Sequence, residues 1–236
     1  MSLSRSPSRR LFAAGIVCGT LCLGAGHQIV APALAQSAKP PAPTAAPVQV
    51  DLFRGLADIF SRGMDTLTDK LNRQGYSARV YSTNGWQAVA QRIAADYARG
   101  RKDIVVLIGH SLGANATIQL ANALDRSNIP VDLIVNFDGT EPLQVPKNVK
   151  HVVNFYQNNG FGKRLSPGPG FTGELSNIDL TADANLSHTT IDKSPRLHAQ
   201  VIAKIVDIVN KDLAAKIEAS KPKKKKPKPK PQAAPQ

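Results

Sequence analysis

A run of five aliphatic residues at 104–108 leads directly into the sequence Gly-His-Ser-Leu-Gly at 109–113. An alanine-rich segment of helical character, residues 114–124, follows without a break. Consecutive aliphatic residues are typical of a strand that is buried on both faces of a sheet. Glycines two residues before and after a serine allow a strand and a helix to approach closely. The pattern therefore predicts a strand, a strained turn and a helix, with Ser111 exposed as a nucleophile at the positive end of the helix.

The rest of the chain between residues 48 and 220 alternates between strand-like and helix-like patterns. We expect strands at 48–53, 77–81, 131–137 and 149–156, a weaker strand at 175–180, and helices at 66–73, 86–98 and 195–217. Helices that recur between apolar strands predict an α/β fold, in which a mostly parallel sheet is covered by helices on both faces. Residues 56–63 and 158–172 have no regular pattern. The second of these segments is rich in glycine and proline, and it either borders a binding cleft or is an inert excursion.

Residues 1–35 have the three parts of a secretory signal peptide. They contain no acidic residue, and Arg5, Arg9 and Arg10 precede an apolar run and a small-residue exit, Ala-Leu-Ala. The apolar run is shorter than the roughly 20 residues of a membrane span. Ser-Arg-Arg-Leu-Phe at 8–12 resembles the twin-arginine export motif, and an ordinary secretory signal or an uncleaved anchor stays open as an alternative. We expect an exported protein, located in the bacterial periplasm or secreted.

Most of the formal net charge of +13 lies in the two ends of the chain. We expect residues 36–47, rich in alanine and proline, to form a flexible linker, and residues 221–236, rich in lysine and proline, to form a disordered tail. Without the seven lysines of the tail and the three arginines of the signal segment, twenty of the thirty basic residues remain, against seventeen acidic residues. The domain predicted at 48–220 is thus nearly balanced in charge, which argues against a specific nucleic-acid-binding domain. The tail either makes weak, salt-sensitive contact with an anionic envelope surface or has no partner.

The segment Gly-His-Ser-Leu-Gly-Ala at 109–114 resembles the nucleophile motif of the α/β-hydrolase superfamily, in the form that is frequent among lipases, esterases and thioesterases. The resemblance covers about residues 48–209, and it is strongest in this motif and in two residues downstream. It implies an α/β-hydrolase fold with a minimal cap, since the chain is short and has no obvious helical cap domain. It also implies a catalytic triad in the chain order serine, acid, histidine, and a reaction that uses no cofactor or metal.

The acid that the resemblance implies is Asp138, which directly follows the predicted strand 131–137. A carboxylate at the carboxyl end of a parallel strand faces the same edge of the sheet as Ser111. Many members of the superfamily place the acid one strand later, so Asp179 and Asp183, on or just after the last predicted strand, stay open as alternatives. Asp138 also precedes a glycine, and a turn residue without a catalytic role has the same pattern.

The base that the resemblance implies is His188, because it lies in the loop between the last predicted strand and the last predicted helix, where the superfamily keeps its histidine. His110 lies inside the motif itself, and we expect its ring to point away from the serine oxygen. His151 opens a predicted strand, and His198 lies in the last helix. His27 belongs to the signal segment, which leaves His188 as the candidate.

These assignments imply acyl transfer to Ser111, with His188 as the base and Asp138 as the group that orients it. The expected substrate is a small-molecule or lipid-like ester of a carboxylic acid, or a thioester. Two other classes stay open. One is a catalytically inactive binding protein of the cell envelope, in which the histidine and the acid do not reach the serine. The other is an attachment protein that acts through its basic tail. The sequence gives no indication of the oligomeric state.

The tetrahedral intermediate of such a reaction needs two backbone donors for its oxyanion. One should be the amide of Leu112, directly after the nucleophile. The other should come from the loop after the strand at 48–53, at Gly55 or Leu56.

Overall fold

The computed structural model describes residues 46–56 and 61–221. The predicted signal peptide at 1–35, most of the linker at 36–47 and all but the first residue of the tail at 221–236 lie outside the described residues. Within the described part of the chain, no helix combines the length and the apolar character that crossing a membrane requires.

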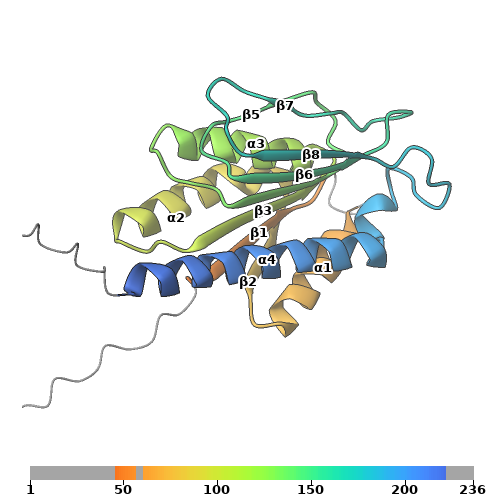
Figure 1. Ribbon diagram of the computed structural model, residues 1–236. Helices are drawn as coiled ribbons and strands as arrows, with labels where there is room; N and C mark the ends of the chain where they lie inside the picture. Colours follow the sequence, from red (N-terminus) through yellow and green to blue (C-terminus); the bar gives the residue numbers. More distant parts are fainter. Residues whose placement is uncertain (1–45, 57–60, 222–236) are drawn as a thin grey trace, which may run out of the picture. The chain divides into compact units, whose positions relative to one another are not determined.

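The described residues build one six-stranded sheet. Its strands are β1 (Val48–Phe53), β2 (Ser77–Tyr81), β3 (Ile104–His110), β4 (Leu133–Phe137), β6 (His151–Tyr156) and β8 (Glu174–Asp179). They lie in the order β2-β1-β3-β4-β6-β8, and every neighbouring pair is parallel (Figure 1). Parallel neighbours need long crossover connections, which here contain most of the helices.

Helices cover both faces of this sheet. They are α1 (Arg62–Arg73), α2 (Trp86–Ala98), α3 (Leu112–Asp125) and α4 (Pro195–Ser220), with two short 3₁₀ helices, η1 (Thr83–Gly85) and η2 (Ile191–Lys193). α1 and α4 pack on one face, and α2 and α3 pack on the other (Figure 1). On β3, Val106 and Ile108 join the core under α1 and α4, whereas Val105 and Leu107 join the core under α2 and α3. Burial on both faces explains why this strand is aliphatic, and the predicted α/β fold class is confirmed.

The strand and the helix around the nucleophile are longer than the sequence pattern suggests. β3 continues to His110, and α3 begins at Leu112 rather than near residue 114. Ser111 is therefore the single residue between the two elements. The glycines of the motif weaken both periodic patterns, so the sequence places the element ends too far apart.

The first helix also begins earlier than expected. Residues 56–63 are expected to be irregular, which is wrong for the last two, since α1 starts at Arg62. Gly63 has a low helix propensity, but packing requires it: a Cβ at this position would lie 2.0 Å from the carbonyl oxygen of Asp192. The tertiary contact overrides the local preference.

The segment at 158–172, expected to be irregular, contains a short strand. β7 (Ser166–Pro167) pairs in parallel with β5 (Gln144–Val145) and forms a separate two-stranded sheet. Strands of two residues have no periodicity that a sequence pattern reveals.

Asp192, in η2, is a buried carboxyl group that joins the loop before α4 to the start of α1. Its Oδ2 accepts a hydrogen bond from the Gly63 amide at 2.9 Å, whereas its Oδ1 has no hydrogen-bond partner among the described residues. Burial raises the pKa of this carboxyl group from the usual 3.8 to about 6. The charged form is therefore destabilised in the folded chain at neutral pH.

We expect Asp192→Asn to stabilise the fold at neutral pH. Because the folded-state pKa lies above the unfolded value, the native state binds the proton more tightly, and this group's contribution to stability is lost as the pH rises from about 4 to about 6. Asparagine does not titrate. The difference in unfolding free energy, variant minus wild type, should therefore increase across this range by up to roughly 3 kcal/mol.

Urea unfolding between about pH 4 and pH 8 measures this difference. Asp69→Asn, which removes an exposed carboxylate from α1, is the control for the loss of charge alone. A difference between Asp192→Asn and wild type that does not change with pH would contradict the assignment.

Candidate active site

Ser111 occupies a strained turn between β3 and α3. Its backbone has φ 58° and ψ −124°, a positive φ that residues with side chains rarely adopt. Two glycines allow the turn to be tight. A Cβ on Gly109 would lie 2.2 Å from the carbonyl oxygen of Gly113, and a Cβ on Gly113 would lie 2.2 Å from that of Phe53. Strand and helix are thus in backbone contact, which is the geometry of a nucleophile elbow.

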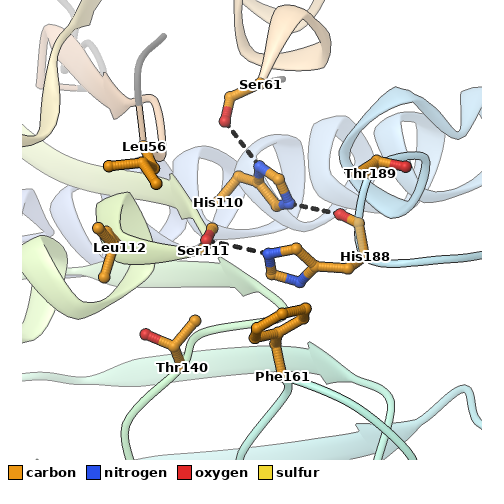
Figure 2. A pocket seen from close by; sticks show the side chains of 9 residues that line it. All are labelled: Leu56, Ser61, His110, Ser111, Leu112, Thr140, Phe161, His188 and Thr189. Atoms are coloured by element: carbon orange, nitrogen blue, oxygen red, sulfur yellow. Dashed lines mark hydrogen bonds between the residues drawn. The ribbon is translucent and has the colours of Figure 1, made fainter. Parts of the chain in front are cut away.

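Ser111, His188 and Asp138 form one hydrogen-bonded chain. Oγ of Ser111 lies 3.0 Å from Nε2 of His188 (Figure 2), and Nδ1 of His188 lies 2.6 Å from Oδ2 of Asp138. Ser111 lies in the turn after β3, Asp138 directly follows β4, and His188 lies in the loop between β8 and η2. A carboxylate only accepts hydrogen bonds, so Nδ1 carries the imidazole proton and Nε2 accepts from the serine hydroxyl.

The carboxyl group of Asp138 is buried, and both of its oxygens are bonded. Oδ1 accepts from the backbone amide of Gln157 at 2.8 Å, and Oδ2 accepts from His188. The side chain of Gln157 donates to the carbonyl oxygen of Leu186 at 3.2 Å, which ties the histidine loop to the end of β6. Gly162 packs directly against the carboxylate, since a Cβ there would lie 2.0 Å from Oδ1 of Asp138.

The two alternative acids are bonded elsewhere. Oδ1 of Asp179 accepts from the amide of Thr181 at 2.9 Å, and Oδ2 of Asp183 accepts from Arg196 at 2.5 Å. Neither is bonded to His188. The structure brings the first candidate, Asp138, to the histidine and keeps the other two apart from it.

The predicted oxyanion donors lie beside the nucleophile. Leu112 is the first residue of α3, and Gly55 lies so close to Ser111 that a Cβ on it would be 2.8 Å from the serine Cβ. The amide of Gly55, however, donates to Oγ of Ser61 at 2.7 Å. This bond leaves Leu56 as the better of the two predicted donors from the loop after β1.

A cavity of about 420 Å³ opens at the Ser111 side chain. Leu56 and Phe161 contribute apolar side chains that are 68% and 63% exposed. The ring of Phe161 lies against that of His188, with 4.6 Å between the ring centroids. The segment at 158–172 therefore borders the cleft, one of the two interpretations that the sequence left open. The lining residues, shown in Figure 2, are Leu56, Ser61, His110, Ser111, Leu112, Thr140, Phe161, His188 and Thr189.

Away from this cleft, acidic and histidine side chains contact charged neighbours at several places. His151 at the start of β6 contacts Glu174 at 3.0 Å, and Asp51 in β1 binds Arg92 at 2.7 Å. In the described ranges, no group of three or more histidine, cysteine, aspartate or glutamate side chains is placed to hold a metal ion.

The order of the parts along the chain identifies the type of fold. A parallel sheet leads through β3 into a strained serine turn, the acid follows β4, and the histidine follows β8. Other serine hydrolase folds arrange the same three residues in a different chain order. The chain has the α/β-hydrolase fold.

Three solved structures are similar to the chain at low sequence identity. A thioesterase, RedJ, from the prodiginine biosynthetic pathway in Streptomyces coelicolor is 15% identical, with a TM-score of 0.43 and coverage of 74% of this chain and 97% of that chain. A cutinase-like protein from Cryptococcus sp. is 14% identical, with a TM-score of 0.42 and coverage of 72% and 98%. A protein described as a hydrolase of the α/β superfamily, from Xanthomonas campestris pv. campestris, is 16% identical, with a TM-score of 0.35 and coverage of 66% and 99%. No family model and no curated protein matches the chain.

Two residues that line this cleft, Ser61 and His110, are missing from the functional residues that the sequence predicts. Nε2 of His110 lies 2.7 Å from the carbonyl oxygen of His188, and its Nδ1 lies 2.7 Å from Oγ of Ser61 (Figure 2). The ring points away from the serine nucleophile, as expected, but it points toward the base. Ser61 lies in a segment without a pattern, so the sequence has no signal for it.

We expect Gly162→Ala to slow the labelling of Ser111 by a fluorophosphonate probe by roughly tenfold to a hundredfold. The new methyl group would lie 2.0 Å from Oδ1 of Asp138 and would push the carboxylate away from His188. Gly160→Ala is the matched control, because a Cβ at that position meets nothing within 4 Å. Labelling rates are compared for variants that circular dichroism shows to be folded. Equal rates for the two variants would mean that Gly162 does not set the position of the carboxylate.

Proposed function

We propose that this chain is a serine hydrolase that cleaves carboxylic esters or thioesters through an acyl-enzyme on Ser111. One observation carries the proposal. His188 lies within hydrogen-bonding distance of both Oγ of Ser111, at 3.0 Å, and the carboxylate of Asp138, at 2.6 Å. An inactive binding protein with the same fold would be expected to have a broken triad, and the distances argue against it.

In the first half of the reaction, Nε2 of His188 removes the hydroxyl proton of Ser111 while Oγ attacks the carbonyl carbon. The carboxylate of Asp138 stabilises the imidazolium that forms. The tetrahedral intermediate then breaks its bond to the alcohol or thiol, which leaves with the proton from His188. In the second half, His188 removes a proton from water and the water oxygen attacks the acyl carbon. The bond between that carbon and Oγ then breaks, Oγ takes the proton back from His188, and the acid product leaves.

The negative charge on the carbonyl oxygen needs N–H groups that are already in place. We assign this role to the amide of Leu112, at the N-terminus of α3, and to that of Leu56. Gly55 is the alternative to Leu56 only if its amide leaves Ser61. One such donor contributes about 3 kcal/mol to lowering the barrier.

The cleft fits a substrate with an apolar acyl or alcohol group. Leu56, Leu112 and Phe161 line it, and its polar lining beyond the triad consists of small or buried groups such as Thr140. Its volume of about 420 Å³ suits a small molecule, since such sites span roughly 300–1,000 Å³. A small-molecule or lipid-like ester is therefore the substrate class that we propose.

Fluorophosphonate should label the mature protein at Ser111, leave Ser111→Ala unlabelled, and label His188→Ala roughly 10⁴-fold more slowly than wild type. Mass spectrometry of the labelled peptide locates the adduct. The control is His151→Ala, which removes a histidine at the start of β6 that contacts Glu174, and it should react at the wild-type rate. An unreactive wild type would remove the enzyme proposal, and labelling of Ser111→Ala would move the nucleophile elsewhere.

We further propose that the protein is exported by the twin-arginine route and acts in the bacterial periplasm or outside the cell. The support is the sequence of residues 1–35, with its paired arginines, apolar run and small-residue exit. The tail at 221–236 would add a weak, salt-sensitive attraction to an anionic envelope surface.

Replacing Arg9 and Arg10 together by lysine should retain the protein in the cytoplasm of a bacterial host, because a receptor reads the twin-arginine signal and lysine lacks the guanidinium group. Immunoblots of periplasmic and cytoplasmic fractions measure the effect. A chain that lacks residues 221–236 is the control, since its signal segment is intact and it should be exported like the wild type. Undiminished export of the double-lysine variant would indicate an ordinary secretory signal.

A further inference from the structure

His110, the residue before the nucleophile, is buried and bonded at both ring nitrogens. Its Nε2 lies 2.7 Å from the carbonyl oxygen of His188, and its Nδ1 lies 2.7 Å from Oγ of Ser61 (Figure 2). The same Oγ accepts the amide proton of Gly55 at 2.7 Å. One imidazole therefore links the loop of the base to the loop of the oxyanion donors.

The direction of these bonds follows from the chemistry of the partners. A carbonyl oxygen only accepts, so Nε2 of His110 carries a proton and donates to His188. Burial lowers the pKa of His110 to about 4, so the ring is neutral at neutral pH and its Nδ1 has no proton. Nδ1 then accepts from the hydroxyl of Ser61, whose oxygen accepts from Gly55. Each proton in the link has an acceptor, and the link runs through four residues without a gap.

The link joins the segment of His188, which lies outside the sheet, and the start of α1 to the ends of β1 and β3, which are neighbours in the sheet. Gly55 follows β1, Ser61 precedes α1, His110 ends β3, and His188 lies between β8 and η2. The chain around His188 runs in turns, so regular secondary structure does not fix the base. Its ring instead lies between the rings of His110 and Phe161, with centroid distances of 5.0 Å and 4.6 Å.

We propose that His110 is a positioning residue for the reaction at Ser111: by bonding the carbonyl of His188 and the hydroxyl of Ser61, it fixes the base and, through Ser61, the amide of Gly55 relative to the nucleophile. The inference rests on the proposed function. His110 acts through its two neighbours and takes no part in proton transfer to the substrate. A misplacement of the base by about 1 Å is enough to cost up to 10²-fold in rate, so a residue with this role affects kcat.

Two substitutions at His110 each remove one of its two hydrogen bonds and keep the other. In His110→Asn, the side-chain oxygen replaces Nδ1 and keeps the bond to Ser61, while the donor to His188 is lost. In His110→Gln, the side-chain nitrogen replaces Nε2 and keeps the bond to His188, while the acceptor for Ser61 is lost. The matched control is His198→Gln, because His198 is also buried and also donates from Nε2 to a backbone carbonyl, that of Asp192, at 2.6 Å.

The experiment measures fluorophosphonate labelling, hydrolysis of p-nitrophenyl acetate and melting temperature for the full chain with these substitutions, each with and without Ser61→Ala. We expect the single variants at His110 and Ser61 to lower kcat about tenfold with KM within about threefold of wild type. Ser61→Ala should have its full effect on kcat in His110→Asn, which keeps the bond between the two residues, and a much smaller effect in His110→Gln, which has lost it. His198→Gln should lower the melting temperature and leave kcat unchanged.

Wild-type kcat in both His110 variants, or an equal effect of Ser61→Ala in both backgrounds, would overturn the proposal. If the His110 variants do not fold, Ser61→Ala and ¹⁵N NMR of the wild-type imidazoles decide it. A neutral His110 ring with its proton on Nε2 at neutral pH supports the link, whereas a proton on Nδ1 overturns it. Failure of fluorophosphonate to label the wild type would overturn the proposed function instead, and the NMR result does not depend on that function.

Discussion

The close contact between β3 and α3 is the constraint on which the rest of the site depends. Because Gly109 and Gly113 have no side chains, the first turn of the helix meets the strand end and also the carbonyl oxygen of Phe53 at the end of β1. A methyl group on either glycine would force strand and helix apart. The positive φ of Ser111 is unfavourable in itself, and it persists because the buried strand and helix on either side leave the turn no room to relax.

A parallel sheet turns this local contact into a site, because the carboxyl ends of its strands gather at one edge. Ser111 follows β3, Asp138 follows β4 and Gln157 follows β6, and these strands are neighbours in the sheet. The amide of Gln157 binds one oxygen of Asp138 and leaves the other for His188. Asp138 follows a strand one earlier than the acid of many α/β hydrolases. It reaches His188 because the amide of Gln157, after the next strand, orients its carboxylate. Gly162 makes this possible by leaving space beside the carboxylate.

Sequence patterns predict those parts of the molecule that have a local cause. The aliphatic strand, the glycines of the nucleophile turn and the alternation of strands and helices are of this kind, and the fold class follows from them. Chain order points to Asp138 and His188. It does not separate Asp138 from Asp179, because it does not tell how far each carboxylate lies from His188. Contacts between segments far apart in the chain leave no local pattern, which is why the bond between Gly55 and Ser61, and with it the choice between the two oxyanion donors, needs the structure.

Side chains, more than secondary structure, hold the loop that carries His188. His110 donates from Nε2 to the carbonyl of His188 within this loop, whereas His198 donates from Nε2 to the carbonyl of Asp192 in η2, beyond the loop. Burial lowers the pKa of both rings, so each stays neutral and keeps Nδ1 as an acceptor for a second partner. The neutral ring of His110 thereby bonds the carbonyl of His188 and the hydroxyl of Ser61 at once, and an apolar side chain in its place would remove both bonds, at a cost of about 1–3 kcal/mol for each buried group. The bond from His110 thus holds the segment of His188, which is made of turns, against the end of β3.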